Sequence, residues 1–133
     1  MDGSEGRDQQ PCRTVRLLIA DDNSLSRVGL RALLATFPGI QVVGEAGDGR
    51  EAVVLAESEA PDVVLMDALM PGMDGLEATR AIKDRWPEVR VVILTLYGFY
   101  RPRAAQVGAD AFLLKGCPTD ELLEAITGPS TYY

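Results

Sequence analysis

Side chains that could carry phosphate or metal chemistry follow four short apolar stretches of the sequence. They are Asp21, Asp22, Asp67, Thr95 and Lys115. Three carboxylates, a hydroxyl and an ammonium are the groups that bind a divalent cation and a phosphoryl group in proteins. If the fold brings them together, they form a site for phosphoryl transfer.

Asp67 is the best candidate for a nucleophile. It directly follows the apolar run 63–66, whose lack of alternation indicates a strand covered on both faces. A carboxylate can accept a phosphoryl group as an aspartyl-phosphate. Two unit charges about 4 Å apart repel by roughly 4 kcal/mol at an effective dielectric constant of ~20. If Asp21, Asp22 and Asp67 cluster, they therefore call for a cation, and Mg²⁺ suits carboxylates that leave room for water and phosphate oxygens.

Each of these residues also has an ordinary structural interpretation. Asp21 and Asp22 precede a helical pattern and could simply cap it. Asp67 could be a turn residue, Thr95 a strand-end hydroxyl, and Lys115 a solvated charge. The functional interpretation depends on their joint position at the carboxyl ends of successive strands, where open α/β sheets bind their ligands.

Five predicted strands alternate with five predicted helices. Apolar runs predict strands over 15–20, 40–46, 63–66, 89–94 and 109–114. Apolar spacing and turn residues predict helices over 25–34, 51–59, 75–85, 102–107 and 119–126. Pro102 limits the fourth helix, and Thr119 is the expected cap of the last. The alternation predicts an α/β fold of three layers, a doubly wound parallel sheet, with the flavodoxin-like strand order 2-1-3-4-5 among the few permitted.

Composition sets bounds on the class of protein. The 133 residues suffice for one domain with a core, and the net charge of −7 argues against a nucleic-acid-binding surface. The chain has no histidine, which excludes a Cys/His zinc site. No apolar run approaches the roughly 18 residues of a membrane span, so we expect a cytoplasmic protein without membrane contact. The polar residues 1–13 are predicted to be a disordered leader.

The motifs resemble those of the receiver domain of two-component response regulators, over about 15–126. They are Asp21-Asp22, Met66-Asp67, the segment 70–75 (Met-Pro-Gly-Met-Asp-Gly), Leu94-Thr95, the segment 108–110 (Gly-Ala-Asp) and Leu113-Leu114-Lys115. Within that family, the segments 42–46 and 114–116 are most similar to NarL/LuxR-type regulators, whose output is a helix-turn-helix. The resemblance implies a CheY-like (βα)5 receiver over 14–127, followed at 128–133 by a tail or the start of a linker.

The resemblance also implies a role for each acidic residue. Asp67 would accept the phosphoryl group from a phosphohistidine of a sensor histidine kinase. Asp22 would bind Mg²⁺ directly with Asp21 in support, and Asp67 and the backbone carbonyl of Leu69 would complete the protein ligands.

Three further residues would then form the switch. Lys115 would contact the phosphoryl group, and Thr95 would move onto it. Phe112 would turn inward as Thr95 moves, although plain strand packing explains Phe112 equally well. Activation would favour a homodimer through the face of the fourth helix, fifth strand and fifth helix. No helix-turn-helix lies in these 133 residues, so DNA would be bound by a separate output domain, and we favour a fragment of a longer regulator over a stand-alone receiver.

Three features depart from the family pattern. Leu96 follows Thr95 where a small residue is usual, which predicts slow phosphorylation by small donors. Leu69, two residues past Asp67, is apolar and predicts slow loss of the phosphoryl group. The segment 96–103 is rich in aromatic residues and includes Pro102, which predicts a short or distorted fourth helix and an altered partner interface.

Two other functions remain to be weighed. A receiver could act through protein contacts without being phosphorylated, as the bulky Leu96 and the aromatic segment suggest. A Mg²⁺-dependent phosphohydrolase with an aspartyl nucleophile, as in haloacid-dehalogenase-like proteins, would need an acid where this chain has Leu69. We therefore expect a signalling switch rather than an enzyme.

Overall fold

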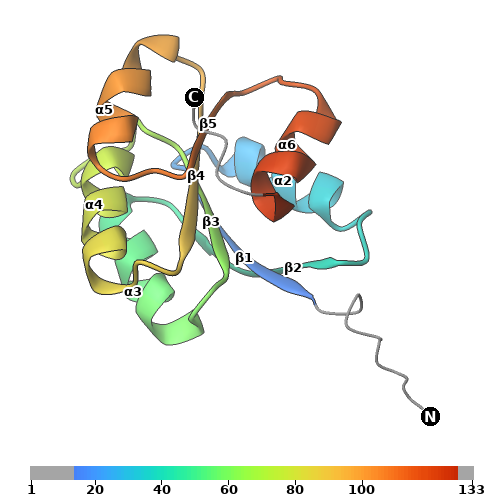
Figure 1. Ribbon diagram of the computed structural model, residues 1–133. Coiled ribbons are helices and arrows are strands. Elements are labelled where there is room, and N and C mark those ends of the chain that lie inside the picture. The colour runs from blue at the N-terminus through green and yellow to red at the C-terminus, as the bar shows by residue number, and fades with distance from the viewer. Residues whose placement is uncertain (1–13, 129–133) are drawn as a thin grey trace.

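The computed structural model describes residues 14–128 (Figure 1). The predicted leader and all but the first residue of the predicted tail lie outside these residues. Within the described chain, no helix is both long and apolar enough to cross a membrane.

Five parallel strands form one sheet in the order β2-β1-β3-β4-β5. The strands are β1 (Val15–Ala20), β2 (Ile40–Ala46), β3 (Val63–Met66), β4 (Arg90–Thr95) and β5 (Ala111–Leu114). This order is the one expected, and the fold prediction is confirmed. The order places β1, β3 and β4 in the interior of the sheet.

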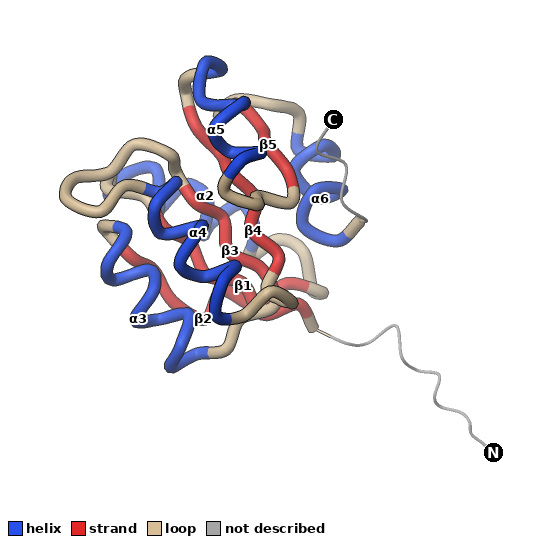
Figure 2. Tube along the Cα trace, turned by 60° about the vertical axis from the view of Figure 1, so that its left-hand side comes forward, coloured by secondary structure: helices blue, strands red, loops and turns tan. Residues whose placement is uncertain are grey.

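Helices cover both faces of the sheet, as Figures 1 and 2 show. They are α2 (Ser24–Leu34), α3 (Gly49–Glu59), α4 (Gly75–Arg85), α5 (Arg101–Gln106) and α6 (Thr119–Thr127), with a 3₁₀ turn η2 (Gly98–Tyr100) before α5. Buried residues of α3, α4 and α5 belong to one apolar cluster, and those of α2 and α6 to the other. The molecule therefore has three layers with a core on each side of the sheet.

The strand β3 explains why both faces are needed. All four of its residues are buried. Val64 and Met66 pack in the core under α3, α4 and α5, whereas Val63 and Leu65 pack in the core under α2 and α6. Because successive side chains of a strand point to opposite faces, an unbroken apolar run is stable only when both faces are covered.

Several element boundaries differ from the prediction. Strand β4 begins at Arg90 because the amide of Val89 bonds to the Trp86 carbonyl in a turn. Strand β5 begins at Ala111 because the amide of Ala109 still bonds to the Ala104 carbonyl of α5. Thr119 is the first residue of α6 and Pro118 its N-cap, so the predicted Thr119 cap is wrong.

Two further differences concern helices near the site. Helix α3 begins at Gly49, two residues early, because the Asp48 side chain caps it by accepting from the amide of Glu51. On α2, Leu25 and Val28 have the spacing typical of a buried helix face, yet Leu25 is 80% exposed and Val28 is 61% exposed. That helix buries Leu34 and contacts the sheet mainly through its second half.

Candidate phosphoryl-transfer site

The strand register brings the predicted site residues to one edge of the sheet. Ala20 of β1 pairs with Met66 of β3, and Met66 pairs with Ile93 of β4. The amide of Asp67 donates to the Ala20 carbonyl at 2.9 Å, which sets Asp67 beside the end of β1. On the other side, Thr95 pairs with Leu114, directly before Lys115. Residues far apart in the chain thus meet at the carboxyl ends of four neighbouring strands.

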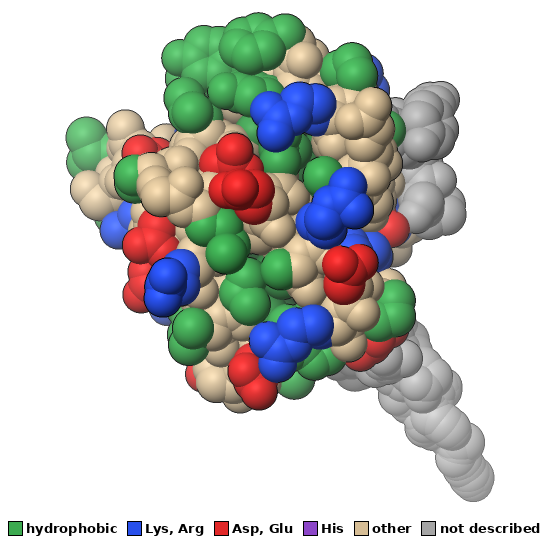
Figure 3. All heavy atoms as spheres, turned by 90° about the vertical axis from the view of Figure 1, so that its left-hand side faces the viewer, with side chains coloured by type: hydrophobic (Ala, Val, Ile, Leu, Met, Phe, Trp, Pro, Cys, Tyr) green, Lys and Arg blue, Asp and Glu red, His purple; other side chains and the backbone are tan. Residues whose placement is uncertain are grey.

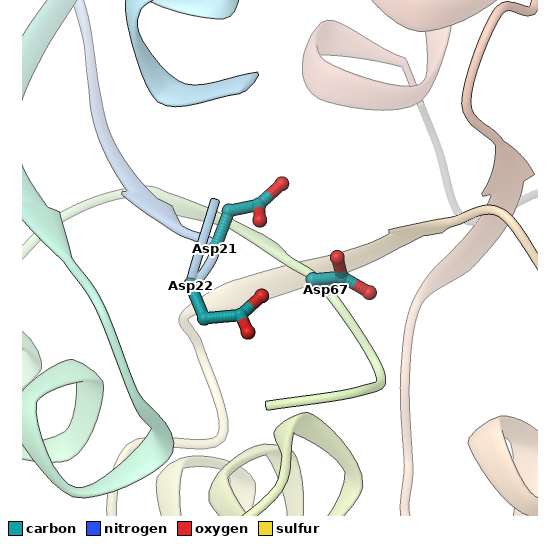
Figure 4. A group of neighbouring side chains, drawn as sticks. All are labelled: Asp21, Asp22 and Asp67. Atoms are coloured by element: carbon teal, nitrogen blue, oxygen red, sulfur yellow. The ribbon is translucent and has the colours of Figure 1, made fainter. Parts of the chain in front are cut away.

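Asp21, Asp22 and Asp67 form a carboxylate cluster. Their side chains extend from the ends of β1 and β3 (Figure 4), and one oxygen from each lies within 4.8 Å of the others. Asp21 and Asp67 are buried, with 2% and 8% of their surface exposed, whereas Asp22 is exposed. Two buried carboxylates this close need a compensating cation.

Lys115 supplies part of that compensation. Its Nζ donates to Asp21 Oδ2 at 2.6 Å and to Asp67 Oδ2 at 2.9 Å. Burial alone would lower the pKa of Lys115, but the hydrogen bonds and charges of the two carboxylates outweigh it, and the pKa of Lys115 lies above its ordinary value. The lysine therefore stays charged. Three carboxylates and one ammonium still leave the cluster with a formal charge of −2, which favours a divalent cation.

The loop after β3 holds Asp67 from the backbone side. Gly75 packs so tightly that a Cβ there would lie 1.8 Å from the Asp67 carbonyl oxygen, and its amide donates to the Ala68 carbonyl. Within the loop, the amide of Leu69 donates to Asp67 Oδ1 at 3.2 Å. At the far end, a Cβ on Gly49 would lie 2.2 Å from the Met73 carbonyl oxygen, and the amide of Gly49 donates to that oxygen at 3.0 Å. Asp67 thus rests on a loop whose two ends are both fixed by close backbone contacts.

Thr95 is the unusual member of the site. It is fully buried, and its Oγ1 has no hydrogen-bond partner among residues 14–128. A buried hydroxyl without a partner costs about 1–3 kcal/mol. Thr95 also lines the pocket above Asp67, so an anionic oxygen entering that pocket could accept its hydrogen bond.

The pocket itself has a volume of about 140 Å³. Its lining includes the predicted residues Asp21, Asp22, Asp67, Leu69, Thr95, Leu96 and Lys115. It also includes Asn23, which caps α2, and Tyr97 of the aromatic segment 96–103, neither of which was among the predicted site residues. In the sequence, Asn23 adjoins Asp22 and Tyr97 adjoins Leu96, and this adjacency was the signal that could have placed them at the pocket. Leu69 and Leu96 are 49% and 64% exposed, so apolar side chains surround the entrance.

Phe112 does not line this pocket. It is 4% exposed and packs in the core beneath α4 and α5. The Arg101 guanidinium lies 4.8 Å from the centre of its ring. The Phe112 ring is therefore already buried in this structure, beneath the Arg101 guanidinium, and its role as a rotamer switch stays a prediction.

The chain matches a known family over nearly all of its described length. The family model for the response regulator receiver domain covers residues 17–127. Response regulator GacA of Pseudomonas aeruginosa is 40% identical over 114 residues, which are 84% of this chain and 53% of that protein. Response regulator protein VraR of Staphylococcus aureus is 37% identical over 115 residues, 85% of this chain and 55% of that protein. The chain thus spans about half the length of these curated relatives.

Solved structures give the same result. The receiver domain of the putative response regulator NarL from Mycobacterium tuberculosis superposes with a TM-score of 0.80 at 35% identity, covering 86% of this chain and 94% of that one. A LuxR-family response regulator from Aurantimonas gives a TM-score of 0.80 at 36% identity, with 85% and 82% covered. The family match, the strand order and these relatives agree: the chain belongs to the response regulator receiver domain family and is of the NarL/LuxR type.

Proposed function

We propose that this chain is a phosphoacceptor receiver, phosphorylated on Asp67 by a sensor histidine kinase in a Mg²⁺-dependent reaction. One observation carries the proposal: the buried Asp67 carboxylate shares a small pocket with Asp21, Asp22, the Lys115 ammonium and the unpaired Thr95 hydroxyl. An acidic cluster with one fixed ammonium suits a cation and a phosphoryl group together.

In the proposed step, a carboxylate oxygen of Asp67 attacks phosphorus while the P–N bond of the donor phosphohistidine breaks. The electron pair of that bond stays with the ring nitrogen. The second ring nitrogen of the donor carries a proton, so histidine leaves as a neutral imidazole. Lys115, already 2.9 Å from Asp67 Oδ2, would offset part of the negative charge of the transferred group. The Thr95 hydroxyl would donate a hydrogen bond to a phosphoryl oxygen, and this oxygen would be the partner that Thr95 lacks among residues 14–128.

The residues fit a bound Mg²⁺. Asp22 would be a direct ligand, with Asp21 and Asp67 beside it and the Leu69 backbone carbonyl as a further ligand. The formal charge of −2 and the 4.8 Å clustering support this set, and the exposure of Asp22 leaves room for water. The ion would shield the negative charges of nucleophile and donor from each other.

The signal would be a shift between two populated arrangements. Phosphorylation favours the one in which Thr95 and Lys115 both reach the phosphoryl group. Movement of Thr95 would draw the chain after β4 toward the pocket. Phe112 would stay packed in the core beneath α5 during this movement. The surface formed by α5, β5 and α6 would report the change, through a homodimer or through the output domain.

The relatives support a proposal about the wider setting of this chain. We infer a cytoplasmic signal transducer without turnover of an external substrate, whose transcriptional effect depends on a separate LuxR-type DNA-binding domain. The response regulators GacA and VraR are about twice as long as the region in which they match this chain. The phosphohydrolase alternative has little support, because Leu69 stands where its general acid would be.

Beryllofluoride, a phosphoryl mimic, tests the proposal directly. With Mg²⁺ it should shift the amide NMR signals of β4, η2 and α5 in the native chain, and Asp67→Asn should abolish the shift. Asp84→Asn is the matched control, since Asp84 is exposed on α4 and outside the pocket, and it should respond like the native chain. A native chain that does not respond, or an equal response from Asp67→Asn, would refute phosphorylation at this site.

A receiver that works without phosphorylation is the second candidate. The observation in its favour is the apolar entrance, where Leu96 and Tyr97 stand beside Leu69. The same experiment separates the two candidates, because this second function predicts no response to the mimic even at saturating Mg²⁺.

A further inference from the structure

Arg27 lies behind the acidic cluster and has no role in the function described above. It is on the first turn of α2, with its side chain largely buried at 21% exposure. Its terminal nitrogen NH1 donates to the backbone carbonyl of Asp21, and its Nε donates to Glu45 Oε1 at 3.2 Å. The guanidinium thus joins the end of β1 to β2.

The contact with Asp21 differs from an ordinary surface ion pair. Exposed pairs contribute only about 0–1 kcal/mol and leave the backbone where it is. Here the acceptor is the carbonyl of the peptide that links Asp21 to Asp22. The amide of Asp21 is already bonded to the Ala46 carbonyl, so Arg27 fixes the other side of the residue.

The orientation of that peptide matters for Asp22 in particular. Asp21 is buried, and its carboxylate is held by Lys115 and by the amide of Asn23 at 2.9 Å. Asp22 is exposed, so packing does not hold its side chain. The direction in which its carboxylate points therefore depends on the backbone that Arg27 holds.

The anchor is itself braced. Glu45 lies between two arginines, Arg27 on one oxygen and Arg31 on the other, with Arg31 NH1 at 3.0 Å from Oε2. A guanidinium with two fixed acceptors has little freedom to move. Arg31 contacts Glu45 but does not contact Asp21 in this structure. Variants of Arg27 and Arg31 therefore distinguish loss of the contact with Glu45 from loss of the contact with Asp21.

We propose that Arg27 is a positioning residue for the cation site: it holds the Asp21–Asp22 peptide so that the Asp22 carboxylate faces Asp67, and it thereby sets the affinity for Mg²⁺. This inference rests on the proposed function. Residues that orient metal ligands from behind typically contribute 10–100-fold to metal affinity.

The positive charge of Arg27 by itself predicts the opposite change in Mg²⁺ affinity when Arg27 is replaced. The test can therefore distinguish positioning from electrostatic repulsion. A guanidinium close to the site repels a cation, so electrostatics alone would make Mg²⁺ bind more tightly once the charge is removed. Loss of positioning makes Mg²⁺ bind more weakly. The direction of the change therefore identifies the cause.

The experiment is calorimetric titration of Mg²⁺ into the metal-free native chain and into Arg27→Gln, Arg27→Lys and Arg31→Gln. We expect about tenfold weaker binding in Arg27→Gln. Arg27→Lys, which keeps the charge and one donor, should restore part of the affinity, and Arg31→Gln should bind like the native chain. Urea unfolding of each variant checks that the fold is retained, and Arg27→Lys carries the test if Arg27→Gln does not fold.

Three outcomes would overturn the inference. Arg27→Gln or Arg27→Lys could bind Mg²⁺ as tightly as the native chain or more tightly, or Arg31→Gln could weaken binding as much as Arg27→Gln. In these cases the proposed function stands, because the native chain still binds Mg²⁺. If the native chain binds no Mg²⁺, the proposed function fails and the role of Arg27 fails with it.

Discussion

Two segments form the entrance around Asp67: the loop between β3 and α4, which carries Asp67, and the chain after β4. They are anchored very differently. On one side, α4 begins with a capping box in which the Asp74 side chain accepts from the amide of Glu77 and the Glu77 side chain accepts from the amide of Asp74. The helix has eleven residues, and five of them are buried: Gly75, Leu76, Ala78, Thr79 and Ile82. This side of the site is therefore tied to the core through the buried residues of α4.

On the other side, the chain after Thr95 has few such anchors. It passes through η2 into α5, a helix of six residues that buries Ala104. In the described structure neither η2 nor α5 has a side-chain hydrogen bond at its N-cap. Leu96 and Phe99 are 64% and 72% exposed. In Figure 3, hydrophobic side chains gather at the top of the view, over this part of the chain.

This difference indicates which half of the site can move. Local opening requires less free energy where few apolar contacts and few caps must be broken. The Asp67 loop should therefore keep its geometry in both states, while Thr95 and the segment after it take up the change. The following predictions test that contrast, beginning with the largest effect.

Gly75→Ala should be the most damaging change. A Cβ at this position would lie 1.8 Å from the Asp67 carbonyl oxygen, so the loop or the helix must shift. We expect a loss of about 3 kcal/mol in the free energy of unfolding, measured by urea denaturation. Gly98→Ala on the loosely anchored side is the control, because its nearest contact would be Leu114 Cδ2 at 3.9 Å. Equal losses in the two variants would contradict the contrast.

Leu96→Ala should open the pocket from the loosely anchored side. Leu96 lines the entrance above Asp67, and its removal should let small phosphodonors react several-fold faster. Phosphorylation by acetyl phosphate, followed over time, measures this rate. If Leu96→Ala and the native chain react at the same rate, the side chain does not restrict access.

Leu69→Asn should shorten the lifetime of the phosphoryl group. Leu69 is half-exposed at the entrance, two residues past Asp67, and a polar side chain there could position an attacking water molecule. We expect decay of phospho-Asp67 to accelerate by several-fold, with the protein stability unchanged. An unchanged decay rate would show that water reaches the site independently of residue 69.

Substitution of the aromatic residues of η2 should have the smallest effect. We expect it to change only the association of this chain with a second copy. Phe99 and Tyr100 lie with ring centres 4.5 Å apart, and Tyr97 lies beside both. If this cluster serves an interface on activation, the native chain should sediment faster with the phosphoryl mimic. A variant carrying Phe99→Ala and Tyr100→Ala should not. Equal sedimentation of the two, with and without the mimic, would remove the cluster from the interface.

Much of this fold could be predicted because its signals are local. An apolar run without alternation, such as Val63 to Met66, is stable only as a strand with both faces covered. Five predicted strands separated by helical patterns leave few topologies. The observed order is one of these few, and in it Asp21, Asp67 and Lys115 meet at one edge of the sheet. The helix Gly75–Arg85 was predicted to the residue because its turn chemistry is local as well.

The rest was decided by contacts between residues far apart in the chain. Lys115 bonds to Asp21 across 94 positions and to Asp67 across 48, and only the strand register sets those distances. That Thr95 Oγ1 has no hydrogen-bond partner within residues 14–128 is likewise a property of the packed pocket. Exposure of Leu25 was missed because periodicity reveals a helix face but not how far the sheet extends beneath it. The sequence by itself therefore determined which groups could do chemistry and at which edge of the sheet. The tertiary structure decided how they are paired, since hydrogen bonds require atoms to lie within about 3 Å of each other.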